Sequence, residues 1–123
     1  MKKILVIDDE EDVLIVLGKR LSGAGYQVVK AKNGKQGIEM AKKEKPSLIL
    51  LDILLPDIDG GEVGRLLKLS EKTANIPIIY LTCLYTKTDE KVQGHEVGAN
   101  LFVAKPYNPD ELLNIIKKQI ELA

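Results

Sequence analysis

The sequence has little that could cross-link the chain or anchor it in a membrane. Its 123 residues include a single cysteine, Cys83, which excludes an intramolecular disulfide and a cysteine-rich zinc site. One cysteine is compatible with a reducing compartment. No apolar run approaches the roughly 20 residues of a membrane span. The run Ile4–Ile7 is too short for a signal peptide and ends at Asp8. We therefore expect a cytoplasmic protein with no membrane partner.

The chain also lacks an excess of charge of either sign. The 18 basic and 18 acidic side chains cancel, so there is no general electrostatic reason to expect direct nucleic-acid binding. His95 is the only histidine, so no second histidine can join it in a metal site, and it is expected on an exposed helix. Apolar residues make up 45% and charged residues 29% of the chain, an ordinary globular mixture. We expect one domain over residues 1–123.

Five short apolar runs recur along the chain, and most of them are continuous rather than alternating. Continuous runs are typical of parallel strands that are covered on both faces. The runs are Ile4–Ile7, Val28–Val29, Leu48–Leu51, Ile76–Leu81 and Leu101–Ala104.

Stretches with helical spacing separate these runs. Capping signals support the boundaries, with Asp59 and Asn108 at N-cap positions and Pro109 at a first helical position. The fourth stretch, about Thr88 to Val97, has few apolar positions, and Gly94 costs a helix about 1 kcal/mol relative to alanine. The alternation predicts an α/β fold: a single doubly wound, flavodoxin-like (βα)5 domain with a parallel five-stranded sheet.

Polar side chains follow four of the predicted strands. Asp8 and Asp9 follow the first strand, and Asp52 ends the third. Thr82 ends the fourth, and Lys105 follows the fifth. The carboxyl ends of parallel strands meet at one edge of an open sheet, where ligands bind. We therefore expect these five side chains to converge.

Three carboxylates in one place require a compensating charge. At about 5 Å each pair repels by roughly 3 kcal/mol for an effective dielectric constant of about 20. Lys105 offsets one charge, and the remainder favours a cation or a raised pKa. Oxygen ligands suit Mg²⁺, which often shares its coordination with phosphate. A carboxylate can also accept a phosphoryl group and form an aspartyl phosphate.

With these pieces in this order, the sequence resembles the receiver domain of two-component response regulators over essentially its whole length. The resemblance rests on Asp8-Asp9-Glu10, on Asp52 to Gly60, on Thr82-Cys83, and on Gly98-Ala99 with Lys105-Pro106. It implies the strand order 2-1-3-4-5.

The resemblance also implies a role for each site residue. Asp52 would be the phosphoacceptor, and Thr82 and Lys105 would contact the phosphoryl group. Mg²⁺ or Mn²⁺ would be bound by Asp8, Asp9, Asp52 and the backbone carbonyl of Leu54. Phe102 matches an aromatic switch position that acts with Thr82, and the Lys105-Pro106 bond would be cis. Phosphorylation would change the surface formed by helix 4, strand 5 and helix 5.

The implied phosphoryl donor is a sensor histidine kinase or a histidine phosphotransfer protein, as in a phosphorelay. The resemblance implies a phosphoacceptor domain rather than an enzyme. It would phosphorylate itself from small donors, dephosphorylate itself, and could dimerise when phosphorylated. The output partner or effector domain is not indicated. The sequence fits both a stand-alone protein and a part of a longer regulator.

Two other functions use parts of the same pattern. A magnesium-dependent phosphohydrolase also has an aspartyl nucleophile, but it would want an acid two residues later, where this chain has Leu54, and a substrate-enclosing cap. A receiver-like binding module that is not phosphorylated would not need the complete five-residue site. A P-loop nucleotidase is excluded because the chain has no G-x-x-x-x-G-K-[ST] motif.

Overall fold

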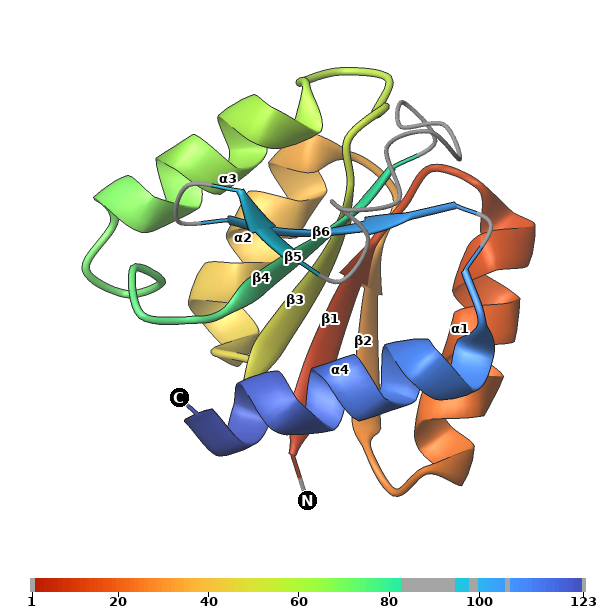
Figure 1. The fold of residues 1–123 in the computed structure, drawn as a ribbon. Helices are drawn as coiled ribbons and strands as arrows, with labels where there is room; N and C mark the ends of the chain where they lie inside the picture. Colours follow the sequence, from red (N-terminus) through yellow and green to blue (C-terminus); the bar gives the residue numbers. More distant parts are fainter. Residues whose placement is uncertain (1, 83–94, 98–99, 106, 123) are drawn as a thin grey trace.

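The computed structural model describes residues 2–82, 95–97, 100–105 and 107–122. Over these ranges the chain folds into one twisted sheet with helices on both faces (Figure 1). The strands are β1 (Lys3–Ile7), β2 (Gln27–Ala31), β3 (Leu48–Asp52), β4 (Ile78–Thr82), β5 (His95–Val97) and β6 (Asn100–Ala104). The helices are α1 (Glu11–Gly23), α2 (Gly34–Glu44), α3 (Gly60–Leu69) and α4 (Pro109–Leu122).

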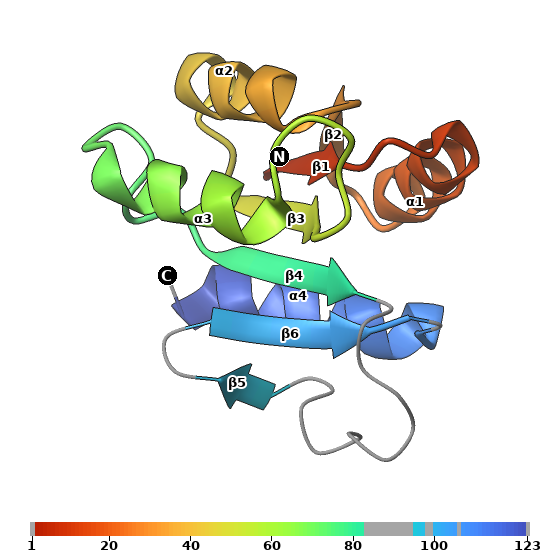
Figure 2. The same cartoon turned by 90° about the horizontal axis from the view of Figure 1, so that it is seen from above.

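The sheet order is β2-β1-β3-β4-β6-β5. The first five strands in this order are parallel to their neighbours, whereas β5 pairs antiparallel with β6. With β6 as the fifth strand of the predicted alternation, this is the expected order 2-1-3-4-5. Figure 2 shows the strands side by side, with β5 at the outer edge. The predicted doubly wound fold is confirmed.

The expectation of a helix over Thr88 to Val97 was wrong for the part that the structure describes. His95–Val97 forms strand β5, in the register His95↔Phe102 and Val97↔Asn100, so His95 is not on a helix. Residues 88–94 lie outside the described residues. Without β5, the backbone of β6 would present unpaired N–H and C=O groups at the sheet edge. The backbone hydrogen bonds that β5 forms with this edge favour a strand. The tendency of the segment to form a helix is weak, because it contains few apolar residues.

The core has two layers, one on each face of the sheet. Leu14, Leu17 and Leu21 of α1 join Leu112 and Ile116 of α4 on one face. On the other face, side chains of α2 and α3 pack against the opposite side of the same strands, among them Ala41, Val63 and Leu67. All residues of β3 are buried. This double coverage explains the continuous apolar runs of the central strands.

Helix ends follow their local sequence signals. Asn108 accepts hydrogen bonds from the backbone N–H groups of Asp110 and Glu111 at the start of α4. Asp59 accepts one from Gly61 at the start of α3. Helix α2 ends before Pro46 with Lys45 in the left-handed region, at φ 47°. These termini fix where the connecting loops begin, including the loop between β3 and α3.

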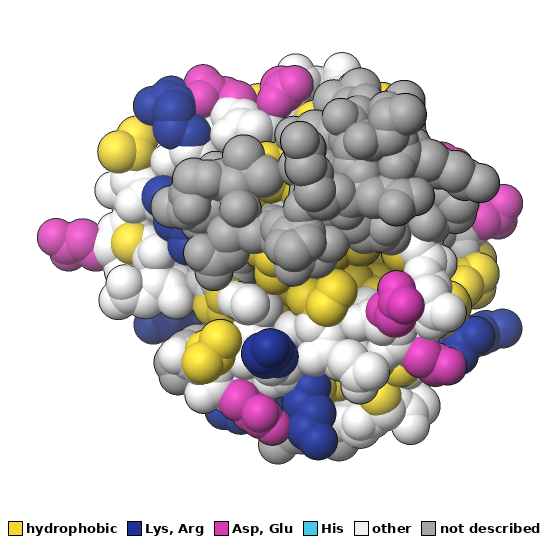
Figure 3. All heavy atoms as spheres, in the orientation of Figure 1, with side chains coloured by type: hydrophobic (Ala, Val, Ile, Leu, Met, Phe, Trp, Pro, Cys, Tyr) yellow, Lys and Arg dark blue, Asp and Glu magenta, His cyan; other side chains and the backbone are white. Residues whose placement is uncertain are grey.

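The described helices include none with the length and apolar character needed to cross a membrane. On the face seen in Figure 3, acidic and basic side chains of the described residues are interspersed. This distribution agrees with the balance of 18 basic and 18 acidic residues.

Candidate functional site

The register of the parallel strands brings the predicted site residues to one edge of the sheet. Ile7 pairs with Leu51, so Asp8 and Asp52 follow at the same level on β1 and β3. Asp52 in turn pairs with Leu81, one residue before the end of β4. Because β1, β3, β4 and β6 are adjacent, their carboxyl ends form a continuous row.

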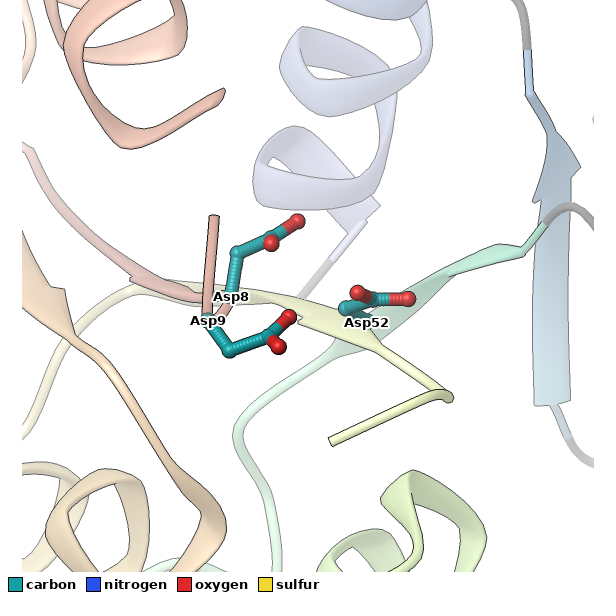
Figure 4. A group of neighbouring side chains, drawn as sticks. All are labelled: Asp8, Asp9 and Asp52. Carbon is teal, nitrogen blue, oxygen red and sulfur yellow. The ribbon is translucent and has the colours of Figure 1, made fainter. Parts of the chain in front are cut away.

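Three carboxylates from two of these strand ends face one another. Asp8, Asp9 and Asp52 each offer an oxygen, and these oxygens all lie within 4.8 Å of one another. Figure 4 shows the side chains of Asp8 and Asp9 extending from the end of β1 toward the side on which Asp52 lies. Asp8 is 1% and Asp52 5% exposed, whereas Asp9 is exposed to solvent. The cluster is therefore buried on one side and open on the other.

Lys105 lies against the buried side of this cluster. Its Nζ is 3.3 Å from Oδ2 of Asp8 and 3.7 Å from Oδ2 of Asp52. Burial disfavours the ammonium ion, but the charges of Asp8 and Asp52 and the hydrogen bond to Asp8 outweigh burial and raise the pKa of Lys105. The lysine therefore stays protonated and bridges the ends of β1 and β3.

Asp52 experiences opposing influences. Burial is the largest and raises the pKa of the Asp52 carboxyl, Lys105 lowers it, and the negative charges of Asp8 and Asp9 raise it further. The backbone N–H of Leu54 donates to Oδ1 of Asp52 over 3.3 Å. The result is a raised pKa, the expected behaviour of a carboxyl group that lacks full charge compensation.

The donor set fits a hard divalent cation. Three carboxylates and one ammonium leave two uncompensated negative charges at the site. Oxygen donors grouped at one open edge are the ligands that Mg²⁺ prefers, with water or phosphate completing its shell. The backbone N–H of Glu10 donates to Oδ1 of Asp8 over 2.9 Å, and Lys105 contacts the other oxygen. Asp8 is therefore held in place, whereas Asp9 is open to solvent.

The structure also locates the other predicted site residues. Thr82 is the last residue of β4 and pairs with Ala104, the residue that precedes Lys105. The side chain of Thr82 is outside the described part of the structure. The Leu54 side chain is 50% exposed, and the metal-binding role of its carbonyl stays a prediction. Pro106 lies outside the described residues, so the predicted cis bond stays untested. Cys83 also lies outside them.

Phe102, the predicted aromatic switch residue, lies on β6, which β4 separates from the strand that carries Asp52. Its ring is half-buried and stacks on the ring of Tyr80, with centroids 5.0 Å apart and planes at 21°. In the crowded layer below, a Cβ at Gly64 would collide with the Tyr80 hydroxyl. Phe102 therefore belongs to the core layer that α2 and α3 cover, and Tyr80 lies between it and α3.

Sequence reasoning missed two residues near the site. Burial raises the pKa of the Tyr107 phenol, with Lys105 opposing and Asp8 adding to the shift, so Tyr107 lies within electrostatic range of both. The sequence signal that could have placed Tyr107 near the site is its position two residues after Lys105. Asp57 binds the start of α2. No local pattern indicates this contact, because the partners are 22 and 23 positions away.

Comparison with known proteins agrees with this geometry. A family model described as the response regulator receiver domain matches residues 4–117. The chain belongs to this family. Receiver domains are signalling domains of two-component systems rather than classical enzymes, which agrees with the sequence-based expectation.

One similar curated protein is the phosphate regulon transcriptional regulatory protein PhoB of Pseudomonas aeruginosa. It is 42% identical over 116 residues, which cover 94% of this receiver domain and 50% of that protein. Aligned regions cover 44% to 50% of the first curated relatives. The chain therefore spans about half the length of the curated relatives it matches.

Solved structures show the same fold. A CheY-like receiver domain protein from Methanospirillum hungatei is 31% identical, with a TM-score of 0.80 and coverage of 98% of this chain and 94% of that one. The receiver domain of the sensor histidine kinase PA1611 from P. aeruginosa has a TM-score of 0.83 at 28% identity, with 98% of each chain covered. That structure contains a magnesium ion coordinated in its active-site cleft.

Proposed function

We propose that this receiver domain is a phosphorylation switch that accepts a phosphoryl group on Asp52 with Mg²⁺ bound beside it. The observation that carries the proposal is the convergence of Asp8, Asp9 and Asp52 within 4.8 Å, with Lys105 within 3.7 Å of Asp52. The magnesium-bound neighbour supports the choice of ion. Asp8, Asp9, Asp52 and the carbonyl of Leu54 would hold it, with Mn²⁺ as a substitute.

The chemistry follows from the groups around Asp52. An oxygen of the ionised carboxylate attacks the phosphorus of a phosphohistidine, the P–N bond breaks, and the imidazole nitrogen leaves with its electron pair and takes up a proton. The product on this chain is an acyl phosphate. Lys105 remains beside the transferred oxygens and offsets their charge, and Thr82 would donate a hydrogen bond to one of them. When bound, Mg²⁺ would neutralise phosphoryl oxygen charge.

A partner that carries the phosphohistidine needs a docking surface close to Asp52. Helix α1 begins at Glu11, two residues after Asp9, and exposes two apolar side chains, Ile15 at 41% and Val16 at 58%. A cleft of about 70 Å³ between α1 and α4 is lined in part by Val16 and Tyr107. These features support docking of a helix from a sensor histidine kinase or a histidine phosphotransfer protein.

The output of the switch would be a change in the surface around β6 and α4, together with the segment between β4 and β5 that lies outside the described residues. Phe102 of β6 stacks on Tyr80 of β4, on the face of the sheet that α2 and α3 cover. Addition of a phosphoryl group is a local charge change that can bias such a packed element between two arrangements. The names and lengths of the curated relatives support a transcriptional effector elsewhere in the full protein, and a phosphorylation-dependent dimer is a compatible output.

The decisive experiment is phosphorylation by a small donor. The protein is incubated with Mg²⁺ and acetyl phosphate, and its intact mass is measured over time. We expect one added phosphoryl group that is lost slowly by self-hydrolysis, and none in the Asp52→Asn variant. Asp59→Asn is a suitable control, because the Asp59 side chain caps α3 and is not one of the carboxylates of the site.

The other outcomes identify the competing functions. Repeated turnover of phosphate esters without a lasting adduct would indicate an aspartyl phosphohydrolase. Absence of both an adduct and Mg²⁺ binding would indicate a receiver-like binding module. Either result would replace the proposed switch.

A further inference from the structure

Asp57, at the tip of the loop between β3 and α3, binds the start of a different helix. Its Oδ1 accepts a hydrogen bond from the backbone N–H of Gly34 over 2.8 Å. Its Oδ2 accepts one from the N–H of Lys35 over 3.0 Å. These are the first two residues of α2, whose free N–H groups and dipole favour a negative charge. The loop after Asp52 is thus tied to α2 by a bidentate contact.

The packing around this contact is close. A Cβ at Gly34 would lie 2.8 Å from Cγ2 of Val63 and 3.1 Å from Cβ of Ile58. The absence of a side chain at Gly34 therefore lets the start of α2 approach the loop. Helix α2 also has a cap of its own, because Asn33 accepts a hydrogen bond from the N–H of Gln36 over 2.8 Å. Asp57 supplements this local cap with a contact between distant segments.

The same loop is fixed at both of its ends next to the site. At its start, the N–H of Leu54 donates to the Asp52 carboxylate over 3.3 Å. At its end, the N–H of Gly60 donates to the Ile53 carbonyl over 2.8 Å. Leu54 lies between the Asp52 contact and the Asp57 contact. The position of the Leu54 peptide therefore depends on both.

We propose that Asp57 is a positioning residue for the metal site, which holds the Leu54 segment in place by binding the start of α2. The inference rests on the proposed function, in which the Leu54 carbonyl is a metal ligand. Without the contact, the loop would keep its two ends but lose its anchor at the tip. Mg²⁺ would then have to order the loop as it binds, and its affinity would fall.

The first test compares Mg²⁺ affinities of variants, measured from the amide chemical shifts of Asp8 and Asp9 during a titration. Asp57→Ala removes both acceptor oxygens, and we expect the Kd for Mg²⁺ to rise about tenfold, the lower end of the range for groups that support metal ligands. Asp57→Asn removes the charge but keeps one acceptor oxygen, so its Kd should rise less.

The matched control is Asn33→Ala. This variant weakens the same helix terminus by removing the local cap, but it leaves the contact between Asp57 and α2 intact. We expect its Kd for Mg²⁺ to stay within about twofold of the wild-type value, because loss of the cap weakens the helix terminus without moving the loop. Comparable stabilities of Asn33→Ala and Asp57→Ala in urea would make the comparison direct.

A second readout follows from the reciprocity of coupled equilibria. If the contact strengthens Mg²⁺ binding, Mg²⁺ must strengthen the contact by the same factor. Saturating Mg²⁺ should therefore slow hydrogen exchange at the amides of Gly34 and Lys35 in the wild-type protein. This protection should be absent in Asp57→Ala, where no carboxylate binds these amides.

The outcomes separate the inference from the function on which it rests. Wild-type Mg²⁺ binding with an unchanged Kd in both Asp57 variants would overturn the positioning role alone. An equal loss of affinity in Asn33→Ala would also overturn it, since helix stability would then explain the effect. No Mg²⁺ binding by the wild-type protein would overturn the proposed function and this inference together. If Asp57→Ala does not fold, Asp57→Asn provides the same comparison.

Discussion

Asp52 combines a buried position with an incompletely compensated charge. It is 5% exposed, and burial together with Asp8 and Asp9 raises the pKa of its carboxyl against the influence of Lys105. Asp57 shows the opposite behaviour, because the backbone N–H groups of Lys35 and Gly34 lower the pKa of its carboxyl. The ionised Asp52 carboxylate therefore destabilises the folded protein when no cation is bound, whereas the ionised Asp57 carboxylate stabilises it.

The raised pKa of Asp52 predicts a pH-dependent effect of its replacement. The folded protein binds the Asp52 proton more tightly than the unfolded chain does, so protonation adds stability that is full below the unfolded Asp pKa of about 3.9 and is lost as the pH rises through the folded pKa. Without metal, Asp52→Asn should therefore be more stable than the wild type at neutral pH. The difference should shrink toward acidic pH in urea unfolding measurements.

Asp57→Asn should show the opposite sign. A lowered folded pKa adds stability that is present above the unfolded pKa and is lost as the pH falls through the folded value. We expect Asp57→Asn to be less stable than the wild type at neutral pH, with the difference vanishing in acid. The same urea series tests it, and a difference that persists below both pKa values would mean that charge is not the cause.

Among the elements, the start of α3 lies close against the backbone at the end of β3, where a side chain at Gly60 would not fit. A Cβ at Gly60 would run into the carbonyl oxygen of Asp52 and the Cα of Ile53. Gly60 therefore permits α3 to start directly against the end of β3. The close approach is backbone against backbone, so no side chain can move aside to relieve it.

Gly60→Ala should consequently destabilise the protein by about 1–3 kcal/mol, the usual cost of overpacking. Gly23→Ala is the control, because a Cβ there meets nothing within 4 Å. At the end of α1 the alanine should be neutral or stabilise the protein by up to about 1 kcal/mol. Free energies of unfolding in urea decide the point, and equal effects of the two substitutions would contradict the packing argument.

For the protein as a whole, binding of a metal ion at the proposed site would be linked to folding. The oxygens of Asp8, Asp9 and Asp52 come together only when β1 and β3 are paired. An ion that binds only the folded state stabilises it by about 2.7 kcal/mol at a concentration of about 100 times Kd. Binding of Mg²⁺ would also relieve the repulsion between the carboxylates.

Mg²⁺ should therefore raise the Tm of the wild-type protein, by several degrees for a domain of this size. The increase in Tm should be much smaller in Asp9→Asn, because this substitution removes a carboxylate of the cluster at an exposed position and leaves the packing of the core unchanged. Thermal unfolding monitored by circular dichroism, with and without Mg²⁺ at constant ionic strength, provides the measurement. An equal increase in both proteins would indicate a general salt effect.

Local patterns predicted most of the fold because burial and chain geometry act on short segments. Continuous apolar runs such as Leu48–Leu51 indicated parallel strands, and polar residues directly after them indicated the site edge. The segment His95–Val97 was assigned to a helix and forms β5 instead. Its partner is the open edge of β6, and a backbone edge leaves no pattern in the sequence of the segment that pairs with it.

The order of residues along the chain was enough to indicate an acidic site at the strand ends, since parallel strands place their carboxyl ends together. It could not give the distances, the burial of Asp8 and Asp52, or the bond from Asp57 to α2. Those depend on register and on contacts between segments more than 20 residues apart. Such contacts form only when the layers pack, because the free energy that stabilises them comes from the assembled core.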